Sequence, residues 1–396
     1  MLKKGLLIPV FLGLLLVSSI AGVPVLAQDG DGVAPVFCGT LTEADCQLLT
    51  DSQQASASLT SATFDVDGGL TVSHIPGMPF DSLEFKLNGS GSYAVDPEVI
   101  ASLKDIQGNT AEFFSHPEQI GQLYESLLGG VAGDLTLTLI LPVEIKAFST
   151  PTNPIPDELS IGLRLVDGIG YVNLDALAEQ VPEAKIPGGW YGLEVAKLSG
   201  TLFQQLFAQI GDTGTIPSFD FKNLSQFSSP DFLSKFATME RLADDNGEAV
   251  FQMTFDYAAL FSGDEFRDLM KSQMSMYGDA MKEADLDQIM DMVQQMYDGL
   301  DMKITTRIGL EDHYIYGGSL ALNWDMTSLM ETMNNLNSSD SGGSSTPQTA
   351  PVLEFEIGIT YDNFNAAPEI EVPDAVDVLK AEDAIKLFGM TLPRNA

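Results

Sequence analysis

The sequence predicts an α+β protein built on one large curved antiparallel sheet, a half-barrel of about 11 strands, with helices covering its concave face. Long segments place apolar side chains at every second position, as between Leu83 and Val95, which is typical of strands with one buried face. A methionine-rich helical segment lies between two such runs, and 11 of the 16 methionines fall between Met270 and Met333. An apolar sheet face needs a covering layer, so these helices are expected to lie against it.

The first residues have the composition of a secretory signal peptide spanning 1–27. Lys3 and Lys4 supply the basic end, residues 5–21 form an apolar core, and small residues precede a cleavage site after Ala27. The mature chain is then expected to begin at Gln28, in a secreted or cell-envelope location. The alternative is an apolar segment retained as a membrane anchor, because its length approaches that of a membrane-spanning helix.

Residues 28–57 are predicted to form an N-terminal helix stapled by a disulfide. Cys38 and Cys46 are the two cysteines of an exported chain, which favours a bridge between them. Thr42 and Asp45 are spaced as an N-terminal cap for the helix that follows.

The strands of the half-barrel domain, 58–364, are predicted from alternation and from turn residues between the runs. They cover residues 64–72, 83–95, 135–147, 159–165, 169–174, 190–195, 239–243, 251–255, 302–308, 314–324 and 353–361. The first two runs pair most simply as an antiparallel hairpin. Ser262 and Glu265 predict a capping box at the start of the methionine-rich helix. Residues 334–351 are predicted to form a flexible insertion, and residues 365–396 a C-terminal extension.

The formal net charge of −37 excludes a nucleic-acid-binding function, which needs basic side chains to replace phosphate counterions. It also disfavours adsorption to anionic lipid surfaces. Self-repulsion favours a soluble monomer, while divalent-cation binding or a saline habitat remain alternative reasons for the acidity.

Chemistry-bearing motifs are weak in this sequence. His74, His116 and His313 have no ligand spacing relative to the cysteines, so no metal site is predicted. The acidic fragments 29–32 and 65–68 lack the later ligands of a calcium loop, and Asp65 and Asp67 fit the wet face of a strand. We therefore expect neither an enzyme nor a cofactor.

The arrangement resembles the LolA-like and mycobacterial lipid-carrier lipoprotein superfamily, in which a bent antiparallel sheet forms a half-barrel and helices close a hydrophobic cavity. The resemblance rests on the exported N-terminal helix, the hairpin at 64–95, the segments 170–172 and 190–191, and the closing strands at 302–361. It implies non-covalent binding of a lipid or other apolar molecule, without chemistry. Whether the protein also has another envelope protein as a partner is left open by the sequence.

Inward-facing apolar residues are the expected lining of such a cavity. The candidates are Phe85, Leu137, Leu139, Met253, Phe255, Met274, Met292, Met296, Ile304, Tyr316 and Phe355. The methionine stripe either fills an ordinary core or forms an adaptable wall around variable alkyl chains. The alternative function is a structural or adhesive envelope protein whose interior is filled by its own side chains.

Overall fold

The computed structural model describes residues 36–75, 78–101, 117–150, 155–182, 185–202, 230–263, 266–267, 290, 292–295, 297–331 and 350–387. The predicted signal peptide, most of the predicted insertion at 334–351 and most of the methionine-rich segment lie outside these ranges.

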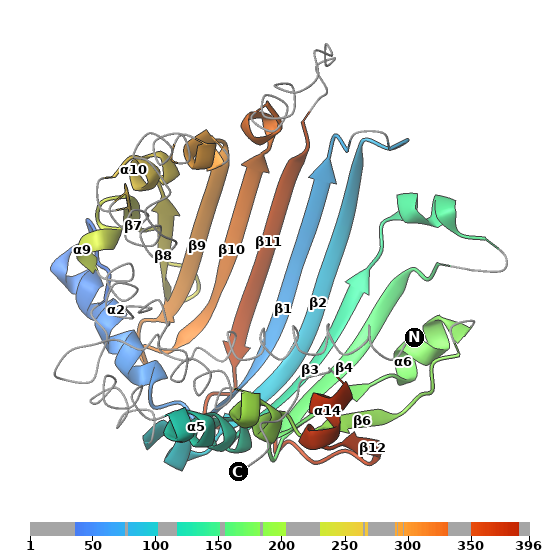
Figure 1. Ribbon diagram of the computed structural model, residues 1–396. Coiled ribbons are helices and arrows are strands. Elements are labelled where there is room, and N and C mark those ends of the chain that lie inside the picture. The colour runs from blue at the N-terminus through green and yellow to red at the C-terminus, as the bar shows by residue number, and fades with distance from the viewer. Residues whose placement is uncertain are drawn as a thin grey trace, which may run out of the picture.

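One sheet of 12 strands forms the body of the described chain, in the order β12-β6-β5-β4-β3-β2-β1-β11-β10-β9-β8-β7 (Figure 1). The strands are β1 (Ser61–Ser73), β2 (Ser82–Val95), β3 (Val131–Ile140), β4 (Glu158–Val166), β5 (Ile169–Asn173), β6 (Trp190–Leu193), β7 (Ala237–Arg241), β8 (Glu248–Phe255), β9 (Leu300–Gly309), β10 (Ile315–Asp325), β11 (Val352–Asp362) and β12 (Ala375–Leu379). All neighbours are antiparallel except β12 and β6, which are parallel. The predicted α+β half-barrel is confirmed.

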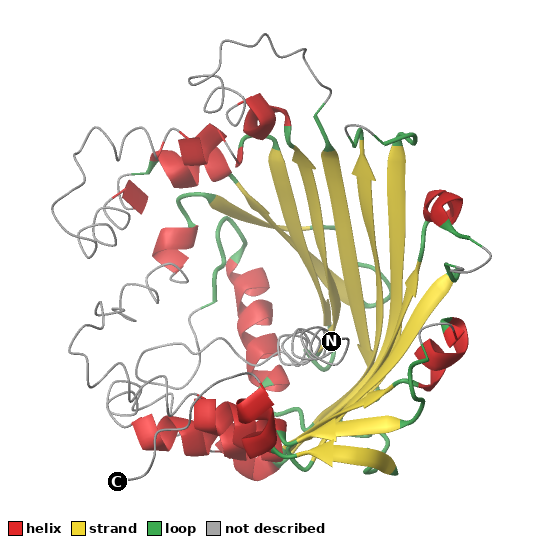
Figure 2. Cartoon of the chain, turned by 45° about the vertical axis from the view of Figure 1, so that its right-hand side comes forward, coloured by secondary structure: helices red, strands yellow, loops and turns green. Residues whose placement is uncertain are grey.

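Helices gather mainly on the concave side of the bent sheet (Figure 2). They are α2 (Glu43–Ser56), α5 (Pro117–Gly129), α6 (Asp175–Gln180), α9 (Pro230–Leu233), α10 (Tyr257–Ser262) and α14 (Ala381–Leu387), with a 3-10 helix at Val143–Phe148 and a helical segment at 195–202. Leu49 of α2 packs with Ala249, Phe251 and Ile308 of β8 and β9, so α2 covers one end of the sheet. Helices α5 and α14 contribute to a second cluster around Leu165 and Leu193.

Three local features differ from the sequence expectation. The strand predicted over 135–147 ends at Ile140, because Pro142 has no N–H for the ladder and precedes the 3-10 helix. Ser262 ends α10 and bonds back to Ala258, whereas Asp256 is the N-cap of that helix. The segment 365–396 contributes β12, so the sheet extends beyond residue 364.

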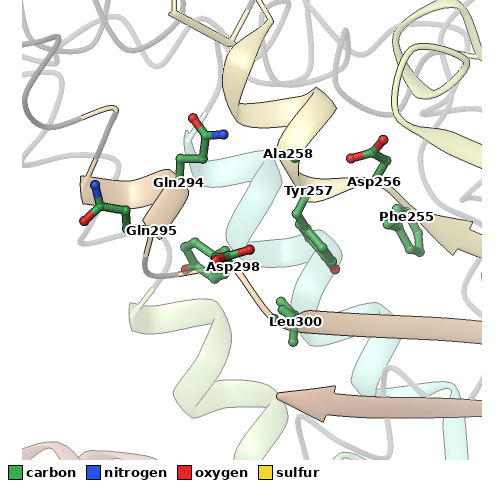
Figure 3. A pocket seen from close by; sticks show the side chains of 10 residues that line it. Phe255, Asp256, Tyr257, Ala258, Gln294, Gln295, Asp298 and Leu300 are labelled. Atoms are coloured by element: carbon green, nitrogen blue, oxygen red, sulfur yellow. The ribbon is translucent and has the colours of Figure 1, made fainter. Parts of the chain in front are cut away.

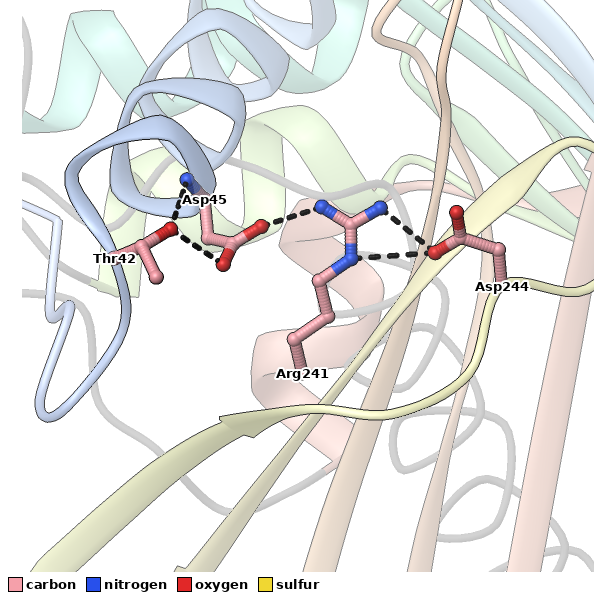
Figure 4. A network of polar contacts seen from close by, with 4 residues as sticks. All are labelled: Thr42, Asp45, Arg241 and Asp244. Atoms are coloured by element: carbon pink, nitrogen blue, oxygen red, sulfur yellow. Dashed lines mark hydrogen bonds and ion pairs between the residues drawn. The ribbon is translucent and has the colours of Figure 1, made fainter.

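Helix α2 is fastened to the rest of the fold near its N-terminus. The predicted disulfide between Cys38 and Cys46 is present, with 5.3 Å between the Cα atoms. Thr42 is the N-cap and accepts the backbone N–H of Asp45, as expected. The Asp45 carboxylate in turn binds Arg241 of β7, and the same guanidinium binds Asp244 (Figure 4). A local capping motif thereby becomes a link between helix and sheet.

Glycines on the apolar face permit close packing where the sheet bends. Gly91 of β2 pairs with Phe64 on one side and Leu135 on the other. A Cβ atom at Gly91 would lie 2.7 Å from Cζ of Phe64 and would also collide with the backbone oxygen of Asp134. The absence of a side chain at Gly91 therefore makes room for the aromatic ring of the neighbouring strand.

Candidate ligand-binding face and pocket

The strand register aligns apolar side chains into rows that cross the sheet on one face. One row near the end of β10 at Asp325 contains Leu300, Trp324, Leu353, Val72 and Leu83. The second row contains Met302, Leu322, Phe355, Leu70 and Phe85. The third row contains Ile304, Leu320, Ile357, Gly68, Leu87 and Leu139. We call these three rows the upper apolar face.

Burial differs strongly along this same side of the sheet. At the opposite ends of the strands, Ala62 and Ile308 are 0% exposed and Phe64 is 4% exposed. Every residue of the upper apolar face is instead only half-buried. Alternation alone would give both halves the same burial, so the difference reflects how completely each half is covered by the rest of the protein.

Seven of the eleven predicted lining residues lie on this side of the sheet and are half-buried. They are Phe85, Leu137, Leu139, Met253, Phe255, Ile304 and Phe355. Met292 is also half-buried, on the helical segment 292–295. Met274 and Met296 lie outside the described residues. The sequence pattern thus placed these strand residues on one surface.

Tyr316 occupies a different environment from the other candidates. A bulge between Ile315 and Gly317 interrupts the alternation of β10, and Ile315 takes the place on the apolar side beside Ile308. The Tyr316 hydroxyl donates to the Asp312 carboxylate at 2.8 Å, and its ring contacts Phe364. The hydrogen bond to Asp312 raises the pKa of Tyr316 to about 12. Its place at the far end of β10 from Trp324 argues for a structural role.

A pocket of about 640 Å³ adjoins the upper apolar face where β8 ends and β9 begins (Figure 3). Its floor is half-buried and is formed by Phe255, Tyr257 and Leu300, whereas the rim is exposed. The remaining lining residues are Asp256, Ala258, Gln294, Gln295, Tyr297, Asp298 and Gly299. Leu300 belongs to the outer row of the upper apolar face, so the pocket and that face are continuous.

Aromatic rings that line or adjoin this pocket pack against one another. Tyr297 stacks nearly parallel to Trp324, with centroids 6.2 Å apart, and lies 6.4 Å from the ring of Tyr257. Phe261 contacts both tyrosines. Burial raises the pKa of Tyr257, and the neighbouring Tyr297 and Asp301 add to that rise. The Tyr257 ring is half-buried and belongs to the less exposed floor of the pocket.

The two pocket carboxylates are positioned by hydrogen bonds. Asp256 accepts the backbone N–H of Ala259 at 2.9 Å while capping α10. Asp298 accepts the hydroxyl of Ser328 at 3.0 Å. In Figure 3 the side chains of Tyr257, on α10, and Asp298, in the turn before β9, approach the pocket from different elements. None of the ten lining residues is a lysine or an arginine.

Sequence reasoning missed this pocket, although it identified Phe255. The available signal was aromatic density, since five aromatic residues lie between Phe251 and Phe266. Elsewhere, Asp65 and Asp67 are exposed on the polar side of β1. Across the described ranges, His, Cys, Asp and Glu form no group of three arranged to hold a metal ion.

Comparison with protein-family models finds no match for this sequence, and comparison with curated proteins finds none either. In the part of the chain that the structure describes, no helix combines the length and apolar character needed to cross a bilayer. The functional argument therefore rests on the geometry of the face and the pocket.

Proposed function

We propose that this protein binds a lipid or another apolar molecule non-covalently on the upper apolar face, as an exported or cell-envelope carrier without catalytic chemistry. The observation that carries the proposal is the burial contrast on one side of the sheet: three continuous apolar rows are half-buried beside a fully buried core. Water is removed from such rows when an apolar ligand covers them, which contributes about 25 cal/mol per Å² of apolar surface.

Three further features support this proposal. The half-barrel resembles the scaffold of LolA-like carriers, in which a bent sheet provides the ligand cavity. The disulfide between Cys38 and Cys46 fits an oxidising compartment outside the cytoplasm. The acidic sequence fits a soluble monomer that does not bind nucleic acid.

The test begins with mass spectrometry of an organic extract from the purified mature chain, residues 28–396. A lipid present at near-stoichiometric amount supports the carrier. Uptake of a fluorescent fatty acid is then compared between Phe355→Asn, on the apolar side of β11, and the matched control Glu354→Asn, which is exposed on the same strand. We expect Phe355→Asn to weaken uptake and Glu354→Asn to leave it unchanged, with both variants folded by circular dichroism.

A folded, lipid-free protein that takes up no fatty acid would support the structural or adhesive envelope protein instead. In that case the upper rows would serve as packing surface for the protein's own segments. The two functions differ in the interior volume left for a ligand.

A further inference from the structure

The pocket beside Tyr257 has a chemical character that the upper apolar face lacks. Its floor is aromatic and apolar, its rim is polar, and both of its charged lining residues, Asp256 and Asp298, are acidic. An anionic group entering this pocket would meet two carboxylates with no basic lining residue to offset them. A cation would meet those carboxylates together with the electron-rich rings of Tyr257 and Tyr297, which also line the pocket.

The surroundings strengthen this preference for positive charge. The whole chain carries a formal charge of −37, which raises the local concentration of cations around an acidic pocket. Asp298 is held by Ser328, and Tyr257 and Tyr297 are held by ring contacts with Phe261. A pocket whose charged and aromatic groups are already fixed loses little freedom when a ligand binds.

The position of the pocket connects it to an apolar path of definite length. From Leu300 the outer row passes through Trp324, Leu353 and Val72 to Leu83. Four steps between neighbouring strands span ~19 Å, at about 4.8 Å for each step. One leaflet of a bilayer's hydrocarbon core is ~15 Å thick, so the row is long enough for one extended acyl chain.

From these observations we infer that the pocket binds the ammonium or quaternary ammonium group of a cationic or zwitterionic amphiphile, whose tail lies along the outer apolar row. This inference rests on the proposed function, because the tail occupies the same face. It adds the class of headgroup: Tyr257 and Tyr297 supply aromatic rings beside the cation, Asp298 neutralises it, and Gln294 and Gln295 form the polar rim.

Isothermal titration of the mature chain with three amphiphiles of identical tail tests the headgroup. The probes are dodecyltrimethylammonium, dodecyl maltoside and dodecyl sulfate, each below its micelle concentration. We expect the ammonium compound to bind about 10-fold more tightly than the maltoside, since a carboxylate and a cation–π contact together contribute an effect of that order. The sulfate should bind most weakly.

Variants separate the pocket from the general negative charge of the protein. Asp298→Asn and Tyr257→Leu should each weaken ammonium binding about fivefold, and leave maltoside binding unchanged. Glu356→Gln removes one charge on the opposite, polar side of β11 and should change neither affinity.

The outcomes distinguish the two proposals. Equal affinity for all three probes would overturn the headgroup assignment while leaving apolar binding intact. Absence of binding by every probe would overturn both. Tightest binding of the maltoside would show that the pocket prefers a neutral polar headgroup. Equal losses of ammonium affinity in Asp298→Asn and Glu356→Gln would show that the ammonium compound is attracted only by the general negative charge of the protein. Either result would overturn the cation site.

Discussion

The guanidinium of Arg241 on β7 binds the carboxylate of Asp45 on α2, which lies 196 residues earlier in the sequence (Figure 4). Arg241 also binds Asp244 and lies over the ring of Phe251, with its Cζ atom 5.6 Å from the ring centroid. One side chain thus joins the helix, the turn after β7 and the core of β8. Its effect on stability should exceed that of a surface ion pair.

Arg241→Ala is expected to lower the free energy of unfolding by about 2 kcal/mol, because it removes charge-assisted hydrogen bonds and packing on Phe251 together. Lys303→Ala is the matched control: its ion pair with Asp301 is exposed, and its loss should cost less than about 1 kcal/mol. Urea unfolding measures both variants. Equal losses would mean that Arg241 contributes no more than an ordinary surface charge.

Acid should weaken the same attachment. The hydrogen bond from Thr42, with a further contribution from Arg241, lowers the pKa of Asp45 below its usual 3.8. A lowered pKa stabilises the folded state above pH 3.8, and this stabilisation is lost as the pH falls through the folded-state value. The difference in urea midpoint between the natural protein and Asp45→Asn should therefore be largest near pH 6 and shrink below about pH 4. A difference that stays constant to pH 2 would contradict this assignment.

Alkaline titration should reveal the bond between Tyr316 and Asp312. The pKa of Tyr316, raised from 10.0 to about 12, favours the protonated hydroxyl in the folded state. The protonated Tyr316 hydroxyl therefore contributes its full stabilisation below pH 10.0, and this contribution is lost as the pH rises to about 12. Tyr316→Phe should lower the free energy of unfolding by about 1 kcal/mol at neutral pH, a value that already allows for partial solvent screening of this hydrogen bond. At the alkaline limit the substitution should change the free energy of unfolding by nothing. Urea unfolding across this range, with tyrosinate absorbance alongside, provides the measurement.

The sheet was predictable from the sequence because alternation is local. The first hairpin forms with Leu70 opposite Phe85, as two alternating runs joined by a turn require. Strand β12 was missed because Ala375–Leu379 is short and mostly exposed, and pairs in parallel with the distant β6. A parallel pairing of this kind depends on the path of the chain more than on the composition of the strand.

The candidate site shows the same limit. Alternation predicted that Phe355 and Ile304 share one face of the sheet, as their register shows, but a one-residue bulge moved Tyr316 out of that set. Asp256 and Asp298 line one pocket because α10 and the turn before β9 lie together, and no local spacing relates them. Residues brought together by tertiary packing are invisible to periodicity.

Trp324 provides a test of burial at the edge of the upper apolar face. Its Nε1 atom is buried and has no hydrogen-bond partner among the described residues. Trp324→Phe keeps the stack with Tyr297 while removing that donor, so stability should change by less than about 1 kcal/mol. Trp324→Ala loses the ring and should cost about 3 kcal/mol. Equal losses in chemical denaturation would show that the indole nitrogen does form a stabilising bond.

Gly91 and Gly69 form a matched pair for the curvature of the sheet. A Cβ atom at Gly91 collides with backbone and with Phe64, whereas at Gly69 of the adjacent β1 the nearest atom is a backbone oxygen at 3.4 Å. Gly91→Ala should therefore destabilise the protein by about 3 kcal/mol or prevent folding. Gly69→Ala should be tolerated, because it meets ordinary contact distances and restricts the unfolded chain. Thermal unfolding of both variants, followed by circular dichroism, compares their stabilities. A Gly91→Ala protein as stable as Gly69→Ala would mean that β2 and β3 move apart easily and that Gly91 has no part in fixing the bend of the sheet.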